Sequence, residues 1–137
     1  LGLKTELSTA DWQKPNKNLG RFDLVWTDVP CSATGVIAKH PEIGLPGRDY
    51  SKHLEEQQKI LENVWRSLHP GGILVYTTCS ILRAENDHQA KWLLDTFPDA
   101  DLIDVKTTGK FISQYGAYFH SDSSKDIMFC CLFRKAK

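Results

Sequence analysis

The sequence lacks an excess of charge of either sign, because its 17 basic and 17 acidic side chains give a formal net charge of zero. A strongly basic balance is typical of proteins that hold nucleic acid mainly by charge, and it is absent here. A small basic patch in one loop is still compatible with this composition. Net charge therefore predicts no class of partner.

Long apolar runs are also missing. No stretch approaches the roughly 18 residues that a membrane-spanning helix requires. The opening segment Leu1-Gly2-Leu3-Lys4 does not have the pattern of a secretory signal peptide, and no initiator Met precedes it. We therefore expect a fragment of a longer cytoplasmic protein with no membrane partner. The hydrophobic content of 41% is ordinary for one globular domain.

Closely spaced cysteine pairs are absent as well. The four cysteines are Cys31, Cys79, Cys130 and Cys131, and none of them forms a C-x-x-C pair. Without such a pair we expect no zinc site and no other metal. The cysteines are too sparse for a disulfide scaffold, so free thiols in a reducing compartment are expected.

What the sequence does contain is an alternation of apolar strands and amphipathic helices. The expected strands are Thr5–Ala10, Phe22–Thr27, Ile73–Thr77, Leu102–Val105 and Ile127–Phe133. The expected helices are Lys52–Leu68 and Glu85–Phe97, and the expected loops are Asp11–Gly20 and residues 32–50. This order predicts an α/β fold with a mostly parallel sheet covered by helices on both sides.

Two cysteines and one carboxylate stand at expected strand ends. Ligands of such sheets bind at the carboxyl ends of the strands. Asp28 and Cys31 follow one strand, and Cys79 follows the next, so neighbouring strands would bring all three to one crevice. A Cys in such a turn can be exposed and reactive, whereas Cys130 and Cys131, inside an apolar strand, are expected to be structural.

The residues around these cysteines resemble a known family. Asp28–Gly35 reads D-V-P-C-S-A-T-G and resembles the D-A-P-C-S-x-T-G segment of RNA 5-methylcytosine methyltransferases. Tyr76–Ser80, followed by Glu85-Asn86, resembles the family's Y-x-T-C-S…E-N segment. Lys39–Ile43 is similar to the R-H-P-D-I stretch of the bacterial Sun/Fmu branch.

The resemblance extends over nearly all of the chain from Asp11 onward, and Val29 is a small departure where the family usually has Ala. It implies a partial Rossmann-like class I methyltransferase fold with an antiparallel last strand. The family's glycine-rich A-P-G-G-K turn is missing, because Pro70-Gly71-Gly72 follows a helix and precedes a strand. Residues 1–137 would thus be the C-terminal part of the S-adenosylmethionine-dependent catalytic domain, with the first strands missing.

A missing first half has physical consequences. The cofactor pocket would be incomplete, and one sheet edge would be exposed to pairing with another chain. We therefore expect the isolated fragment to be inactive, to bind S-adenosylmethionine weakly or not at all, and to dimerise through that edge.

The resemblance also implies a reaction. A methyl group would pass from S-adenosylmethionine to C5 of a cytosine in small-subunit ribosomal RNA. Carried over by motif, Cys79 is the nucleophile that attacks C6, and Cys31 assists release of the methylated product. Asp28 would contact the flipped cytosine or the methionine end of the cofactor. Asp11 aligns with the acidic residue that contacts adenine, although an Asp there is also a common turn residue.

The target base must be unstacked before such chemistry, so an RNA-binding surface is expected nearby. Lys39, His40 and Arg48 lie in the long loop and are candidate contacts to RNA phosphates or bases. A solvated loop is an equally good interpretation of these three side chains.

Rival functions fit parts of the pattern. A non-catalytic RNA-binding or assembly module could keep the methyltransferase fold. A DNA cytosine methyltransferase would use the first cysteine, Cys31, as its nucleophile, and the presence of Cys79 argues against it. A cysteine hydrolase would need a His beside the thiolate, and none of the five His residues lies in a recognisable motif.

Overall fold

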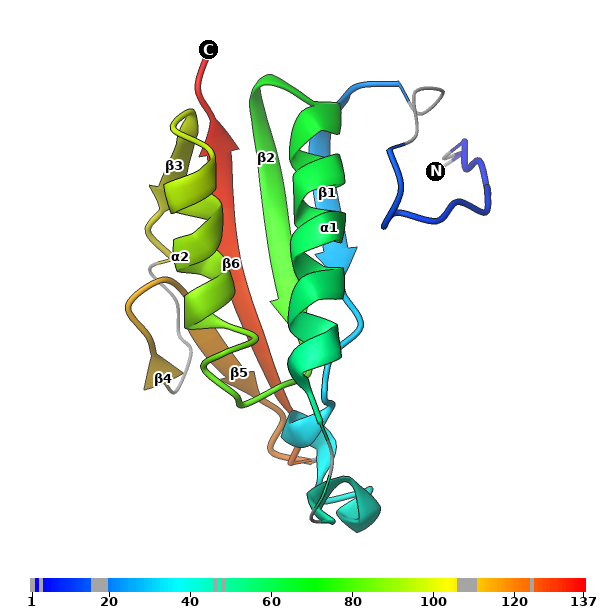
Figure 1. The fold of residues 1–137 in the computed structure, drawn as a ribbon, viewed down its shortest axis with the longest axis vertical. Helices are drawn as coiled ribbons and strands as arrows, with labels where there is room; N and C mark the ends of the chain where they lie inside the picture. Colours follow the sequence, from blue (N-terminus) through cyan, green and yellow to red (C-terminus); the bar gives the residue numbers. More distant parts are fainter. Residues whose placement is uncertain are drawn as a thin grey trace.

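The computed structural model describes residues 2, 4–15, 20–45, 47, 49–105, 111–123 and 125–137. Within these residues one sheet of six strands carries two long helices (Figure 1). The strands are β1 (Phe22–Asp28), β2 (Leu68–Thr78), β3 (Ala100–Ile103), β4 (Phe111–Ile112), β5 (Ala117–His120) and β6 (Ile127–Lys135). The helices are α1 (Ser51–Ser67) and α2 (Asp87–Thr96), with 3-10 turns η1 (Thr34–Val36) and η2 (Pro41–Gly44).

The strand directions give a mixed sheet with the predicted antiparallel last strand. β1 and β2 pair in parallel, and β6 pairs antiparallel with both β2 and β3. Because β6 runs opposite to each of them, β2 and β3 point the same way. The last strand is thus antiparallel, as predicted, and it lies between two strands that precede it in the chain.

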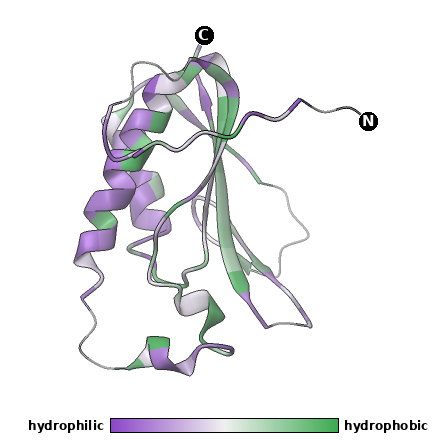
Figure 2. Cartoon of the chain, turned by 90° about the vertical axis from the view of Figure 1, so that its right-hand side faces the viewer, coloured by the Kyte–Doolittle hydropathy of each residue, from purple (hydrophilic) through white to green (hydrophobic). Residues whose placement is uncertain are grey.

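Both helices lie on the same face of the sheet, as Figure 2 shows from the side. The prediction that helices cover both faces is therefore wrong for the described residues. Strand crossovers are right-handed, and the steps from β1 to β2 and from β2 to β3 move in the same direction across the sheet, which puts α1 and α2 on one face. The side chain of Trp26 on the other face is 68% exposed.

Some predicted boundaries need correction. Thr5–Ala10 forms no strand in the structure, and β4 and β5 were not predicted. β2 starts at Leu68 rather than Ile73, because the strand contains an irregular turn of Pro70-Gly71-Gly72 in which Gly71 has a φ of 83°. That positive φ favours glycine. The segment lies inside β2 and not before it, because α1 ends at Ser67 and the strand starts with the next residue.

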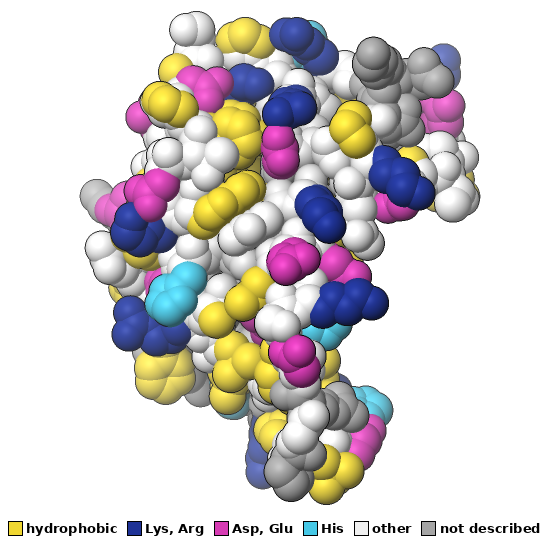
Figure 3. All heavy atoms as spheres, in the orientation of Figure 1, with side chains coloured by type: hydrophobic (Ala, Val, Ile, Leu, Met, Phe, Trp, Pro, Cys, Tyr) yellow, Lys and Arg dark blue, Asp and Glu magenta, His cyan; other side chains and the backbone are white. Residues whose placement is uncertain are grey.

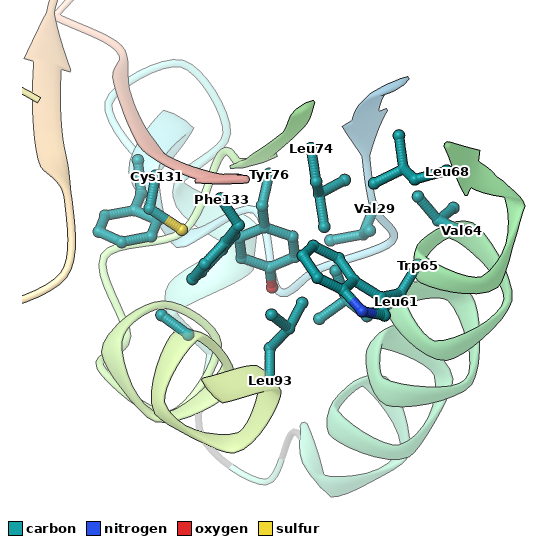
Figure 4. Packing of buried hydrophobic residues seen from close by; sticks show 12 residues of the cluster. Val29, Leu61, Val64, Trp65, Leu68, Leu74, Tyr76, Leu93, Cys131 and Phe133 are labelled. Atoms are coloured by element: carbon teal, nitrogen blue, oxygen red, sulfur yellow. The ribbon is translucent and has the colours of Figure 1, made fainter. Parts of the chain in front are cut away.

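The core fills the space between the sheet and the two helices. Figure 4 shows Leu74 and Tyr76 of β2 and Phe133 of β6 facing Trp65 of α1 and Leu93 of α2. These side chains are at most 1% exposed, and each contributes about 1.5–3 kcal/mol by its burial. The core therefore fixes the strand ends from which the site residues emerge.

The surface over the helices mixes charges of both signs. Figure 3 shows Lys and Arg side chains interspersed with Asp and Glu on this face. Across the described ranges, neither α1 nor α2 nor any shorter helix combines the length and apolar character needed to cross a membrane.

Candidate active site

The parallel pairing of β1 with β2 brings two cysteines together. Asp28 at the end of β1 is in register with Thr77 near the end of β2. Three residues beyond β1, the Sγ atom of Cys31 lies 3.3 Å from the Sγ atom of Cys79. Both thiols are free and half-buried. The predicted meeting of the two cysteines at the carboxyl ends of neighbouring strands is confirmed.

The loop that carries Cys31 packs tightly against the turn that carries Cys79. The backbone N–H of Gly35 donates to the backbone oxygen of Cys79 at 2.8 Å. A Cβ atom at Gly35 would lie 2.3 Å from the backbone oxygen of Ile127 and 2.8 Å from that of Cys79. Only glycine fits this close approach, which explains the last position of the D-V-P-C-S-A-T-G segment.

A buried carboxylate lies beneath the Cys31 loop. Glu85 is fully buried, and its carboxylate accepts hydrogen bonds from the Ser32 N–H at 2.9 Å and the Ser32 hydroxyl at 2.6 Å. The side-chain amide of Gln57 donates to the same carboxylate at 3.2 Å. The next residue, Asn86, is also fully buried and bonds to the turn around Cys79.

Hydroxyl groups connect the two cysteine loops. The Oγ atoms of Ser32 and Ser80 lie 3.1 Å apart, and Thr34 Oγ1 lies 3.2 Å from Ser80 Oγ. These hydroxyls therefore join the two loops. Glu85 and Asn86 belong to the E-N part of the motif, but no pattern in the sequence indicated what either side chain does.

The surroundings of Cys31 change the acidity of its thiol. Burial is the main reason that the pKa of Cys31 rises from 9.0 to about 12. The backbone amide of Ala33 opposes this rise, and the neighbouring Cys79 thiol adds to it. Cys31 therefore keeps its proton at neutral pH. Burial also raises the pKa values of Cys130 and Cys131, in keeping with their predicted structural role.

A pocket of about 430 Å³ lies beside β1. Asp11 and Asp28 both line it, together with the apolar side chains of Trp12, Val29 and Ile60. This volume is in the range of pockets that bind small molecules. The structure thus brings together the two acidic residues that were predicted to bind a cofactor.

Asp11 also shapes its own turn. Its carboxylate accepts a hydrogen bond from the Gln13 N–H at 3.0 Å and pairs with Lys14 at 3.2 Å. The bond from Gln13, followed by Lys14, lowers the pKa of this exposed carboxyl. The turn interpretation therefore holds, and it fixes the carboxylate at the rim of the pocket.

A second pocket, of about 380 Å³, borders the Cys79 thiol. Phe119, His120 and Met128 line it from the β5–β6 hairpin, and Val36 lines it from η1. The sequence did not point to the hairpin residues, because β5 was not predicted. Asp28 lines the pocket beside β1, and Cys79 lines this second pocket.

One of the predicted RNA contacts, Lys39, reaches a residue that lines this second pocket. Lys39 forms an ion pair of 2.6 Å with Asp126, which lines the pocket, and His40 lies 3.1 Å from Glu42 on the surface. Arg48 lies outside the described residues. Among the residues with described positions, no group of three His, Cys, Asp or Glu side chains could hold a metal ion.

The chain has relatives of known class. The family described as 16S rRNA methyltransferase RsmB/F matches residues 1–134. Ribosomal RNA small subunit methyltransferase B from Salmonella newport (strain SL254) is 43% identical over 111 residues, which cover 78% of this chain and 26% of that protein. The chain thus spans about a quarter of the length of the curated relatives that it matches.

Solved structures share the fold. PH0851 superposes with a TM-score of 0.79 at 29% identity, over 90% of this chain and 29% of its own. NSun6 from Pyrococcus horikoshii, solved with SFG, gives a TM-score of 0.79 at 23% identity, over 96% of this chain and 35% of its own. These likenesses confirm the partial Rossmann-like methyltransferase fold.

Proposed function

Because the chain belongs to the RsmB/F family of 16S rRNA methyltransferases, we propose that it forms the C-terminal part of the catalytic domain of an RNA cytosine-C5 methyltransferase. The methyl donor is S-adenosylmethionine, and the substrate is a cytosine of small-subunit ribosomal RNA in the cytoplasm. The observation that carries this proposal is the 3.3 Å approach of two thiols at the ends of two parallel strands.

Cys79 is the proposed nucleophile. Its thiolate forms a bond to C6 of the cytosine, and the electron pair of the C5–C6 double bond becomes available at C5. C5 then takes the methyl group from the sulfonium, which leaves as a neutral sulfide. A base removes the proton from C5, and the C6–sulfur bond breaks to restore the ring. The pocket of about 380 Å³ that borders Cys79 supports this role, because it offers room for an unstacked base.

Cys31 is proposed to assist release of the product. Its raised pKa of about 12 keeps the thiol protonated, and it lies 3.3 Å from the sulfur that must depart. A neutral thiol at this distance can donate a hydrogen bond to the departing thiolate. The second cysteine, Cys79, at the end of the neighbouring strand argues against the DNA-type assignment, which uses Cys31 alone.

The pocket beside β1 is proposed to hold part of the cofactor, which supplies an activated methyl group. Its apolar walls, Trp12, Val29 and Ile60, suit the adenine ring, and the carboxylates of Asp11 and Asp28 suit the polar donors and the positive charge of the molecule. The residues present therefore fit the cofactor. The glycine-rich turn is not among them, so we expect weak binding by these 137 residues alone.

RNA is proposed to reach the Cys79 pocket past η2. Lys39 and His40 lie on this route, and Arg48 follows in the same loop. Each is a candidate phosphate contact. Lys39 would exchange its ion pair with Asp126 for a phosphate oxygen.

The test uses the full-length protein that carries this sequence. It is incubated with methyl-labelled S-adenosylmethionine and unmodified 16S ribosomal RNA, and methyl transfer and protein–RNA adducts are read on denaturing gels. We expect Cys79→Ala to abolish both and Cys31→Ala to accumulate the adduct. Methylation by Cys79→Ala together with an inactive Cys31→Ala would reverse the two roles. No methylation by the wild type would overturn the proposed substrate, and survival of RNA binding in Cys79→Ala without any wild-type activity would favour the assembly module.

A further inference from the structure

Each cysteine of the site is held on both sides. The side-chain amide of Gln57 donates to the backbone oxygen of Pro30 at 2.9 Å, and Glu85 accepts two hydrogen bonds from Ser32. These contacts hold the residues immediately before and after Cys31. Since Gln57 also donates to Glu85, the carboxylate is the common anchor of this loop.

Asn86 holds the residues on both sides of the second cysteine, Cys79. Its side-chain oxygen accepts the hydroxyl of Thr78 at 2.6 Å, and its side-chain nitrogen donates to the backbone oxygen of Ser80 at 2.8 Å. The same nitrogen lies 3.2 Å from the hydroxyl of Tyr118. The residues immediately before and after Cys79 are therefore both tied to one buried amide.

These two anchors are consecutive residues, just before α2 begins at Asp87. A side chain that only filled space here would be less costly if it were apolar, because burying a carboxylate or an amide is unfavourable unless every bond is satisfied. The carboxylate of Glu85 accepts all three of its described hydrogen bonds from neutral donors, which belong to Ser32 and Gln57. The arrangement therefore points to a task that an apolar residue cannot perform.

We infer that Glu85 and Asn86 are positioning residues that together set the separation of the two thiols, Glu85 through the Cys31 loop and Asn86 through the Cys79 turn. The two anchors are adjacent in the backbone, so the two loops are held from neighbouring points, and the contact between Ser32 Oγ and Ser80 Oγ is a second link between them. The separation of the thiols follows from this geometry alone. Its consequence for catalysis rests on the proposed function.

The inference predicts that the two anchors fail in different ways. Loss of the Glu85 anchor displaces Cys31, so the variant resembles Cys31→Ala and accumulates the protein–RNA adduct. Loss of the Asn86 anchor displaces Cys79, so the variant resembles Cys79→Ala and forms little adduct. A merely structural role would lower both adduct formation and release together.

Near-isosteric variants of the two anchors test this inference without creating a cavity in the protein. Glu85→Gln keeps one acceptor oxygen and turns an amide NH2 toward either the hydroxyl or the N–H of Ser32, so the side chain can no longer accept both hydrogen bonds from Ser32. Asn86→Asp places a carboxylate oxygen against the backbone oxygen of Ser80. Gln89→Glu is the matched control, because Gln89 is also buried, its side chain donates to the backbone oxygen of Leu54, and it touches neither loop. Ser32→Ala and Thr78→Ala remove the partners instead of the anchors, and they serve if an anchor variant does not fold.

The first measurement needs no substrate. The full-length variants are treated with diamide, which takes the two thiol hydrogens as the disulfide forms, and the Cys31–Cys79 peptide pair is quantified by mass spectrometry. We expect both anchor variants to cross-link at least about fivefold more slowly than wild type, because the effective concentration of the thiols falls when the loops are released. Gln89→Glu should keep the wild-type rate. Wild-type rates in folded Glu85→Gln and Asn86→Asp would overturn the inference.

The second measurement adds ribosomal RNA and cofactor and scores the adduct. Adduct accumulation in Glu85→Gln and its loss in Asn86→Asp support separate positioning of the two cysteines, and equal losses in both overturn it. If wild type itself does not methylate, the proposed function fails, and the cross-linking rates still decide the positioning role.

Discussion

The hydroxyl of Tyr76 donates a hydrogen bond of 2.7 Å to the backbone oxygen of Glu85. Tyr76 belongs to the core, and Glu85 anchors the cysteine loop, so this bond connects the packing of the sheet to the site. Burial raises the pKa of Tyr76 well above 10.0, so the hydroxyl is protonated and acts as a donor at neutral pH.

Tyr76→Phe should therefore weaken both the fold and the site. Removal of the hydroxyl leaves a buried carbonyl without this donor, at a cost of about 1–2 kcal/mol in the free energy of unfolding. Urea unfolding measures the loss. An unchanged unfolding midpoint would show that another group satisfies the carbonyl.

Gly35→Ala should displace the Cys79 turn. The new Cβ would clash with the backbone oxygens of Ile127 and Cys79. Relief of both clashes would require the start of β6 or the Cys79 turn to move. We expect methyl transfer to fall by about 100-fold or more, since displacement of a reacting group by about 1 Å has that effect. Gly20→Ala is the control, because a Cβ there meets nothing within 4 Å, and it should leave the rate unchanged.

The rate at which iodoacetamide alkylates Cys31 should report the raised pKa of this thiol. Cys31 has a folded pKa of about 12 against an ordinary value of 9.0, so its thiolate is scarce in the folded protein through pH 9. Peptide mapping should find Cys31 alkylated slowly in the folded protein and rapidly in urea at the same pH. Equal rates in both conditions would contradict the raised pKa.

The same shift has a consequence for stability. The folded pKa of Cys31 is raised, so the neutral thiol favours the folded state fully below about pH 9, and this contribution is lost as pH rises from 9 toward 12. Cys31→Ala should flatten the fall of the thermal midpoint over that alkaline range. A fall of the same steepness in the variant would assign it to other groups.

Lys39→Ala should weaken RNA binding in a salt-dependent way. A phosphate contact releases about one counterion, so the slope of log affinity against log salt should fall by about one unit. Lys91→Ala is the matched control, because Lys91 is also exposed and pairs with Asp95 on α2. Equal salt slopes for wild type and Lys39→Ala would show that Lys39 makes no phosphate contact, as expected if the loop is only solvated.

The isolated 137 residues should dimerise through β1. This strand is at the edge of the described sheet, and it exposes Leu24 and Trp26 by 56% and 68%. Sedimentation should give a dimer that Leu24→Lys converts to a monomer. Leu7→Lys, at a residue 94% exposed outside any strand, should leave the dimer intact.

Local patterns predicted the elements that the site needs. The apolar runs before Asp28 and Cys79 are strands, and the amphipathic segment that begins near Ser51 is the helix between them. The thiol contact could be expected because a helix between two strands implies that they are parallel. Tertiary contacts decided the rest: β5 pairs with β6 through residues that show no strand pattern, and the bonds of Glu85 to Ser32 join positions 53 residues apart.

Strand β6 occupies the middle of the sheet although it is made of the last residues of the chain. During synthesis, β1, β2 and β3 leave the ribosome before the strand that must join β2 to β3 exists. The pairing that connects β2 to β3 therefore cannot form until residues 127–135 have been synthesised. Since the backbone oxygen of Ile127 is also one of the two that leave no room for a side chain at Gly35, a nascent chain without this strand would lack the contact that confines the Cys31 loop from the side of β6.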